Sequence, residues 1–197
     1  MMKKLLLCGI TLLFLAACGS SSSTPASSPE ANAIGDQGLT NSQLALNTAL
    51  SRVDLSNVDD ATVDPLNLLG DNTYVDNGLY FQIATGNTTT VRLFGPVTEN
   101  GLTMLIGESA STPFVFTVTG DNDDSTITMD GLVSATDADD NRFVMTFDNI
   151  VGTGSSLTGT VRIAVQLADG TDSLLTIDFS ARQITQVLNG AVSSQSF

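Results

Sequence analysis

The sequence contains no histidine and no tryptophan, and both of its cysteines, Cys8 and Cys18, lie within the first 18 residues. Its two lysines, Lys3 and Lys4, are also near the start, so every later basic residue is an arginine. Ser-His-Asp triads and Cys-His pairs are therefore excluded, and so are zinc sites built from imidazole or thiolate after residue 18. Paired carboxylates can still cleave glycosidic bonds, but the chain lacks tryptophan as a platform for a sugar ring. We therefore expect a protein that is not an enzyme.

Acidic residues outnumber basic ones by three to one, with 21 aspartates and glutamates against seven lysines and arginines. The net charge of the 197 residues is −14. A surface this acidic repels the phosphates of nucleic acids and of anionic lipid headgroups. We therefore expect no nucleic-acid partner.

The first 18 residues have the pattern of a secretory leader. Met1–Lys4 is basic, and Leu5–Phe14 is an apolar run of about ten residues, which is too short to cross a bilayer. Leu15–Cys18, with the sequence Leu-Ala-Ala-Cys, follows directly. This run resembles the lipobox of bacterial lipoproteins, in which a branched residue and two small residues precede an invariant cysteine.

The resemblance implies that residues 1–17 are a signal peptide and that Cys18 receives a diacylglyceryl thioether, becomes the new N-terminus and is acylated there with a fatty acid such as palmitate. Two or more acyl chains anchor a protein stably to a membrane. In Gram-negative members of the family, aspartate after the cysteine favours inner-membrane retention, so Gly19 implies an outer-membrane location. Cleavage would also remove Lys3 and Lys4 and change the net charge from −14 to −16.

Residues 18–38 are expected to form a tether that starts at the lipidated cysteine. They include the serine run Ser20–Ser23 and the segment Thr24–Pro29, which contains two prolines. Such a composition cannot bury enough apolar surface to fold, so we expect this tether to be disordered. About 20 flexible residues span on the order of 25 Å, which lifts the folded part of the chain off the headgroups.

Residues 39–197 are expected to form a single domain that opens with one short amphipathic helix at 41–53. Thr40 and Gln43 match a capping box, which marks the start of a helix. Three apolar residues then recur at the spacing of one helix face, namely Leu46, Leu50 and Val53. We expect this face to pack on the rest of the domain.

From about Leu79 the apolar residues alternate with polar ones, which is the period of a strand with one buried side. Turn sequences such as Asn77-Gly78 separate the alternating runs, and short links favour antiparallel neighbours, whereas the acidic segment 54–78 is expected to consist of turns. The expected strands are 79–84, 89–95, 102–107, 113–119, 125–135, 142–151, 157–168, 173–181 and 183–191. The sequence thus predicts an all-β fold, an antiparallel meander of about nine strands that forms a barrel or a flattened barrel or sandwich.

Two short loops are rich in carboxylates and amides, the oxygen ligands that calcium prefers. One loop is Asp121–Asp124 and the other is Asp137–Asn141. A true EF-hand is excluded because Arg142 occupies the position where that loop requires glycine. A different kind of loop site for Ca2+ is one interpretation, with the candidate ligands Asp121, Asp123, Asp124, Asp137, Asp139 and Asn141. The other interpretation is that these side chains cap hairpin turns.

The sequence indicates no specific partner and leaves three classes of function open. The first is a non-catalytic lipoprotein anchored at the outer membrane, which acts as a structural or interaction module toward an envelope protein or glycan. The second is a lipocalin-like barrel that carries a small apolar ligand. The third is a calcium-dependent adhesion or assembly module that uses the aspartate loops. No cofactor other than Ca2+ is expected.

Overall fold

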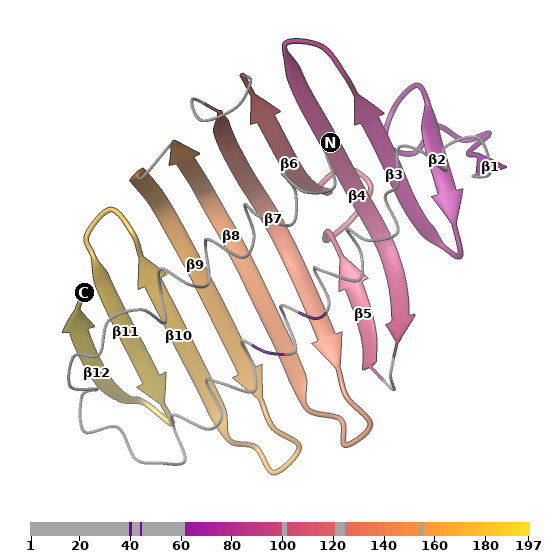
Figure 1. Cartoon of the computed structure of the whole chain (residues 1–197). Coiled ribbons are helices and arrows are strands. Elements are labelled where there is room, and N and C mark those ends of the chain that lie inside the picture. Colours follow the sequence, from indigo (N-terminus) through magenta and orange to yellow (C-terminus); the bar gives the residue numbers. More distant parts are fainter. Residues whose placement is uncertain (1–39, 41–43, 45–61, 100–101, 121–124, 154–155) are drawn as a thin grey trace.

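The computed structural model describes residues 40, 44, 62–99, 102–120, 125–153 and 156–197. In these residues the chain forms one sheet of twelve strands, and every pairing is antiparallel. The strands are β1 (Thr62–Val63), β2 (Thr73–Asp76), β3 (Leu79–Ala84), β4 (Thr88–Glu99), β5 (Leu102–Ile106), β6 (Phe114–Thr119), β7 (Thr126–Thr136), β8 (Arg142–Thr153), β9 (Ser156–Gln166), β10 (Asp172–Asp178), β11 (Gln183–Leu188) and β12 (Ala191–Ser196). The prediction of an all-β antiparallel fold is therefore confirmed (Figure 1).

The strand order follows the chain except at one position in the sheet. β4 is 12 residues long, and its first half pairs with β6 while its second half pairs with β5. On the other side, β7 pairs with the same two short strands. β5 and β6 therefore lie end to end in a single slot between β4 and β7 (Figure 1). Every other pairing joins strands that are consecutive in the sequence.

Two parts of the sheet differ from the strand prediction. Segment 54–78, which was expected to consist of turns, contains β1 and β2, so the sheet has more strands than the nine expected. The expected single strand 183–191 is two strands, β11 and β12, joined by Asn189-Gly190. Asn189 and Gly190 have positive φ angles of 46° and 83°, as a tight two-residue hairpin turn requires.

The signal peptide 1–17, the tether 18–38 and most of the helix expected at 41–53 lie outside the described residues. Leu44 is described, has a helical backbone and packs its half-buried side chain against the core. β1 and β12 are the two ends of the strand order, and no pairing joins them among the described residues. Within the described part of the chain, no helix has the length and apolar character needed to cross a membrane.

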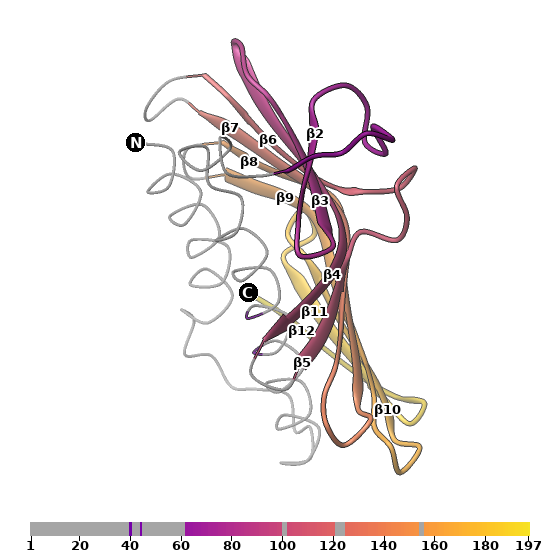
Figure 2. The ribbon, with the colours of Figure 1, turned by 90° about the vertical axis from the view of Figure 1, so that its right-hand side faces the viewer.

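The core lies on one face of the sheet. Along the central strands alternate side chains are buried: Phe114 and Phe116 in β6 are at most 1% exposed, and Phe143 and Met145 in β8 are fully buried. Phe114 meets Phe147 edge to face, with ring centroids 5.5 Å apart. Each such side chain stabilises the fold by about 1.5–3 kcal/mol, so burial decides which face of every strand points inward. Seen edge-on, the sheet is a bent layer rather than a flat one (Figure 2).

One extra residue in β8 keeps both halves of this long strand facing the core. Phe147 and Ile150 are both buried although they lie three positions apart, because Asn149 forms a β-bulge against both neighbouring strands. Asn149 has a φ of 50°, and its backbone N–H donates to Asp130 Oδ1 at 3.3 Å. Gly159 in β9 lies opposite the bulge with a φ of 98°, and a Cβ atom added there would sit 2.8 Å from Ile150 Cα.

We expect Gly159→Ala to lower the free energy of unfolding by about 2–3 kcal/mol, because the added methyl group meets the backbone of the bulge at a strained positive φ. The measurement is urea unfolding of the full chain, followed by circular dichroism. Gly170→Ala is the matched control, since Gly170 has a similar φ of 89° and no atom lies within 4 Å of an added Cβ. The control should lose only about 1 kcal/mol. Equal losses of unfolding free energy in the two variants would show that the close approach at the bulge does not affect stability.

Candidate binding groove on the exposed face of the sheet

The face opposite the core carries mainly polar side chains, as the alternation in the sequence predicts. Thr117 and Thr128 hydrogen-bond to each other across β6 and β7. Arg162 in β9 pairs with Asp148 in β8, with 3.2 Å between Nη1 and Oδ2, and both side chains are nearly half exposed. An exposed ion pair of this kind contributes at most about 1 kcal/mol. Most of this face is thus an ordinary solvated sheet surface.

One row of side chains on this face is apolar at every position but one, which is Ser134 in β7. It crosses eight strands with one residue from each, because the cross-strand partners follow one another without a break from β4 to β12. Leu105, Leu174 and Val192 are 38%, 37% and 70% exposed. We call the eight residues the apolar row; in order they are Pro96, Leu105, Ser134, Val144, Ala164, Leu174, Val187 and Val192.

Polar residues border the apolar row on both sides from β8 to β10. The border away from the hairpin tips lies two positions along each strand from the apolar row. In β8 to β12 its residues are Thr146, Arg162, Thr176, Thr185 and Ser194. In the other direction, from β4 to β10, the neighbours are Thr98, Thr103, Thr136, Arg142, Gln166 and Asp172. From β8 to β10 the apolar row is therefore a narrow stripe between polar residues, separate from the core, whereas in β7 its neighbour on the first side is Leu132.

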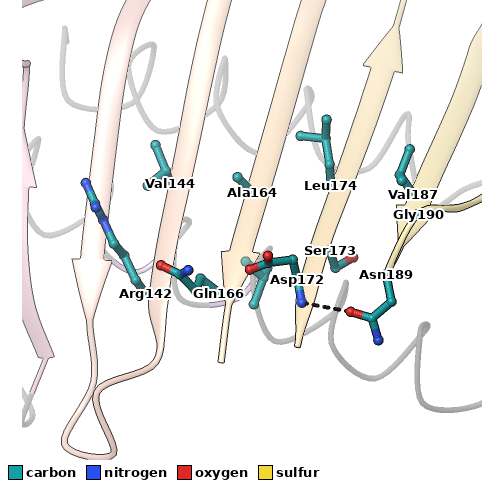
Figure 3. A pocket seen from close by; sticks show the side chains of 11 residues that line it. Arg142, Val144, Ala164, Gln166, Asp172, Ser173, Leu174, Val187, Asn189 and Gly190 are labelled. Carbon is teal, nitrogen blue, oxygen red and sulfur yellow. Dashed lines mark hydrogen bonds between the residues drawn. The ribbon is translucent and has the colours of Figure 1, made fainter. Parts of the chain in front are cut away.

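The part of the apolar row between β8 and β11 forms the floor of an open groove of about 510 Å³. Four side chains of the row lie next to one another along this floor, namely Val144, Ala164, Leu174 and Val187 (Figure 3). The border toward the hairpin tips consists of Arg142, Gln166, Asp172 and Asn189 (Figure 3). Asn189 Oδ1 accepts a hydrogen bond from the backbone N–H of Asp172 at 3.1 Å, which ties β10 to the turn after β11.

Two acidic hairpin tips lie beside this border. The tip between β7 and β8 contains Asp137–Asn141, and the tip between β9 and β10 lies next to it (Figure 1). The backbone N–H of Ala168 in the second tip donates to Asn141 Oδ1 at 3.0 Å. In the first tip, Asp137 Oδ1 accepts the backbone N–H groups of Asp139 and Asn141, both at 3.0 Å, and Asp137 Oδ2 accepts Asn141 Nδ2 at 2.9 Å. Asp137 thus caps its own turn, and Asn141 connects the two tips.

Hydrogen bonds hold one carboxylate of each tip in its charged form. Burial opposes the charge on Asp137, but the side chain and backbone of Asn141 and the backbone of Asp139 donate to it and lower its pKa below the ordinary value of 3.8. In the second tip, the backbone N–H of Thr171 and then its hydroxyl lower the pKa of Asp169. Both carboxylates therefore keep their negative charge to lower pH than an unpaired aspartate.

The structure describes half of the candidate calcium ligands. Asp121, Asp123 and Asp124, like Cys18, lie outside the described residues. Of the other three, Asp137 and Asn141 direct side-chain oxygens to donors of the protein, and Asp139 supplies its backbone N–H. Among the described residues, no three acidic, histidine or cysteine side chains are grouped so as to hold a metal ion. These bonds are those of turn capping, and calcium binding stays a prediction.

The sequence did not reveal the groove. Apart from Ser134, each member of the apolar row is a single apolar residue at a polar-face position of its own strand, and isolated apolar residues are ordinary on protein surfaces. Only the register of the sheet makes them neighbours.

No protein-family model, curated protein or solved structure matches this chain significantly. The geometry of the exposed face and the motif at the start of the chain are therefore the features that indicate a function.

We expect Asp137→Ala to lower the free energy of unfolding at pH 7 by up to about 1 kcal/mol, because three hydrogen bonds of an exposed turn lose their acceptor. Folding lowers the pKa of Asp137, so this contribution is present above the ordinary pKa of 3.8 and is lost as the pH falls through the folded value. Urea unfolding at pH 7 and near pH 3 should show the difference between wild type and variant shrinking in acid. Asp139→Ala is the control and should stay within about 0.5 kcal/mol of wild type. A loss of equal size at both pH values would contradict this role of the carboxylate.

We expect loop 137–141 to add no calcium-dependent rise to the Tm of the full chain relative to a chelator, because oxygens of Asp137 and Asn141 already accept hydrogen bonds from the protein. An ion present at 100 times its Kd would add about 2.7 kcal/mol, which is a shift of several degrees. A rise in Tm that Asp137→Asn or Asp123→Asn abolishes would support the calcium module instead.

Proposed function

We propose that this chain is a lipid-anchored, non-catalytic interaction module of the bacterial cell envelope. The acylated Cys18 holds it at the outer membrane, and the exposed face of the sheet contacts the partner. The observation that carries this proposal is the groove of about 510 Å³ whose floor is an exposed apolar row. Continuous apolar surface with a polar rim is typical of a site where another molecule docks.

The start of the chain supports the anchor. Leu15–Cys18 resembles a lipobox, and the expected tether 18–38 leaves the folded domain free to meet a partner away from the headgroups. The chain has a net charge of −14 and is repelled by anionic headgroups. In this proposal a covalent lipid overcomes that repulsion and keeps the domain at the membrane. The partner in this proposal is an envelope protein or glycan.

A carrier of a small apolar ligand is the second candidate, because the volume of the groove falls within the range of small-molecule sites. Such sites normally bury most of the ligand surface. Here the floor residue Leu174 is 37% exposed on an open sheet face, which suits a broad contact better than an enclosed ligand. The interaction module therefore ranks first.

We expect metabolic labelling with palmitate in a Gram-negative host to mark the wild-type chain and not Cys18→Ser, which should also leave the outer-membrane fraction. Cys8→Ser is the matched control, since Cys8 lies in the segment that is removed, and it should keep both label and location. Gly19→Asp should keep the label and move the chain to the inner-membrane fraction. Label that persists in Cys18→Ser would exclude the anchor.

A further inference from the structure

The charges around the groove indicate the chemistry of its partner. The side of the apolar row that faces the hairpin tips has one basic residue, Arg142, at its border. Five acidic residues lie in the two tips and at the start of β10, namely Asp137, Asp139, Asp140, Asp169 and Asp172. The lowered pKa values of Asp137 and Asp169 keep these two groups charged. The part of the apolar row from β7 to β10 therefore runs beside a strongly negative edge.

We propose that the apolar row and the acidic tips together bind a basic amphipathic helix of another envelope protein. The apolar side of that helix lies on the row, and its lysines or arginines face the aspartates. This inference rests on the proposed function and specifies the partner of the interaction module.

The dimensions of the row fit a helix. Eight strands spaced about 4.8 Å apart give the row a length of about 34 Å, which a helix of about 22 residues spans, and three turns cover the groove between β8 and β11. A helix satisfies its own backbone hydrogen bonds, whereas an extended peptide across the strands would leave its N–H and C=O groups unpaired over an apolar floor. Apolar residues spaced three and four apart form a stripe as narrow as the row.

Other occupants fit the charges less well. A second copy of this chain would bring five aspartates against five aspartates. An anionic lipid headgroup or the carboxylate of a fatty acid would meet the same repulsion at the acidic tips. A basic partner gains attraction at the same place, and complementary charge also speeds its association.

The test uses a synthetic peptide of about 22 residues made of leucine, alanine and lysine, with leucines spaced three and four apart. The full chain is immobilised in nonionic detergent, and binding is measured by surface plasmon resonance against a blank surface. We expect binding that weakens with salt, as charge pairing requires. Leu174→Ser should weaken it about tenfold, and Asp172→Asn several-fold.

Two controls match these variants in residue type and lie off the row. Leu68→Ser removes a leucine that is 37% exposed, the same fraction as Leu174. Asp71→Asn removes an exposed aspartate from the same segment between β1 and β2. Both variants should bind the peptide like wild type.

Three results would overturn the inference. The first is a lack of specificity, shown either by equal binding of a peptide of the same composition with scrambled leucine spacing or by equal losses in the matched variants. The second is a dimer of the full chain that Leu174→Ser dissociates in sedimentation, which would assign the row to a second copy. The third is row-dependent binding to phosphatidylglycerol vesicles without peptide binding, which would assign it to lipid. The palmitate label on Cys18 does not depend on the groove, so failure here is distinct from failure of the lipid anchor.

Discussion

Burial of one face of the sheet is the constraint on which the rest of the structure depends. Side chains alternate along a strand, so a slip of one residue in β8 would expose Phe143 and Met145 and bury Arg142. Burial therefore fixes the register of each strand against its neighbours. Register in turn decides which residues become neighbours on the opposite face. The apolar row and its polar borders are a product of how the core packs.

The bulge at Asn149 lets both halves of β8 bury their apolar side chains on the same face of the sheet. Before the bulge the buried residues of β8 occupy odd positions, and after it Ile150 is buried at an even one. The extra residue shifts the pairing of β8 with both β7 and β9, while the alternation of those two strands continues unchanged. Gly159 makes this possible because it lets the backbone of β9 come close to the bulge. The half of the sheet that carries the groove and the threonine-rich half beyond the bulge therefore bury their apolar side chains on the same face.

The sequence predicted the fold class and most strands because alternation and turn residues are local signals. It missed β1 and β2, since two and four residues are too few to show a period. It also missed the Asn189-Gly190 turn, although this dipeptide favours a hairpin, because apolar Val187, Leu188, Ala191 and Val192 on both sides resemble one continuous strand. The aspartate loop 137–141 was ambiguous between a metal site and a turn, and only the described hydrogen bonds of Asp137 show the capping. The apolar row depends on partners such as Leu105 and Ser134, which lie far apart in the chain and which no local pattern connects.

The slot shared by β5 and β6 also bears on the order in which the sheet assembles. Most strands pair with the strand before and after them, and hairpins of this kind close quickly because few residues separate the partners. In the slot, β4 must meet β6 and β5 must meet β7, so each pairing skips a strand. Until both short strands are in place, the long edges of β4 and β7 have unpaired backbone groups that can recruit another chain. We therefore expect the two ends of the sheet to form early and independently, and its centre to be completed last and to be the stage most exposed to aggregation.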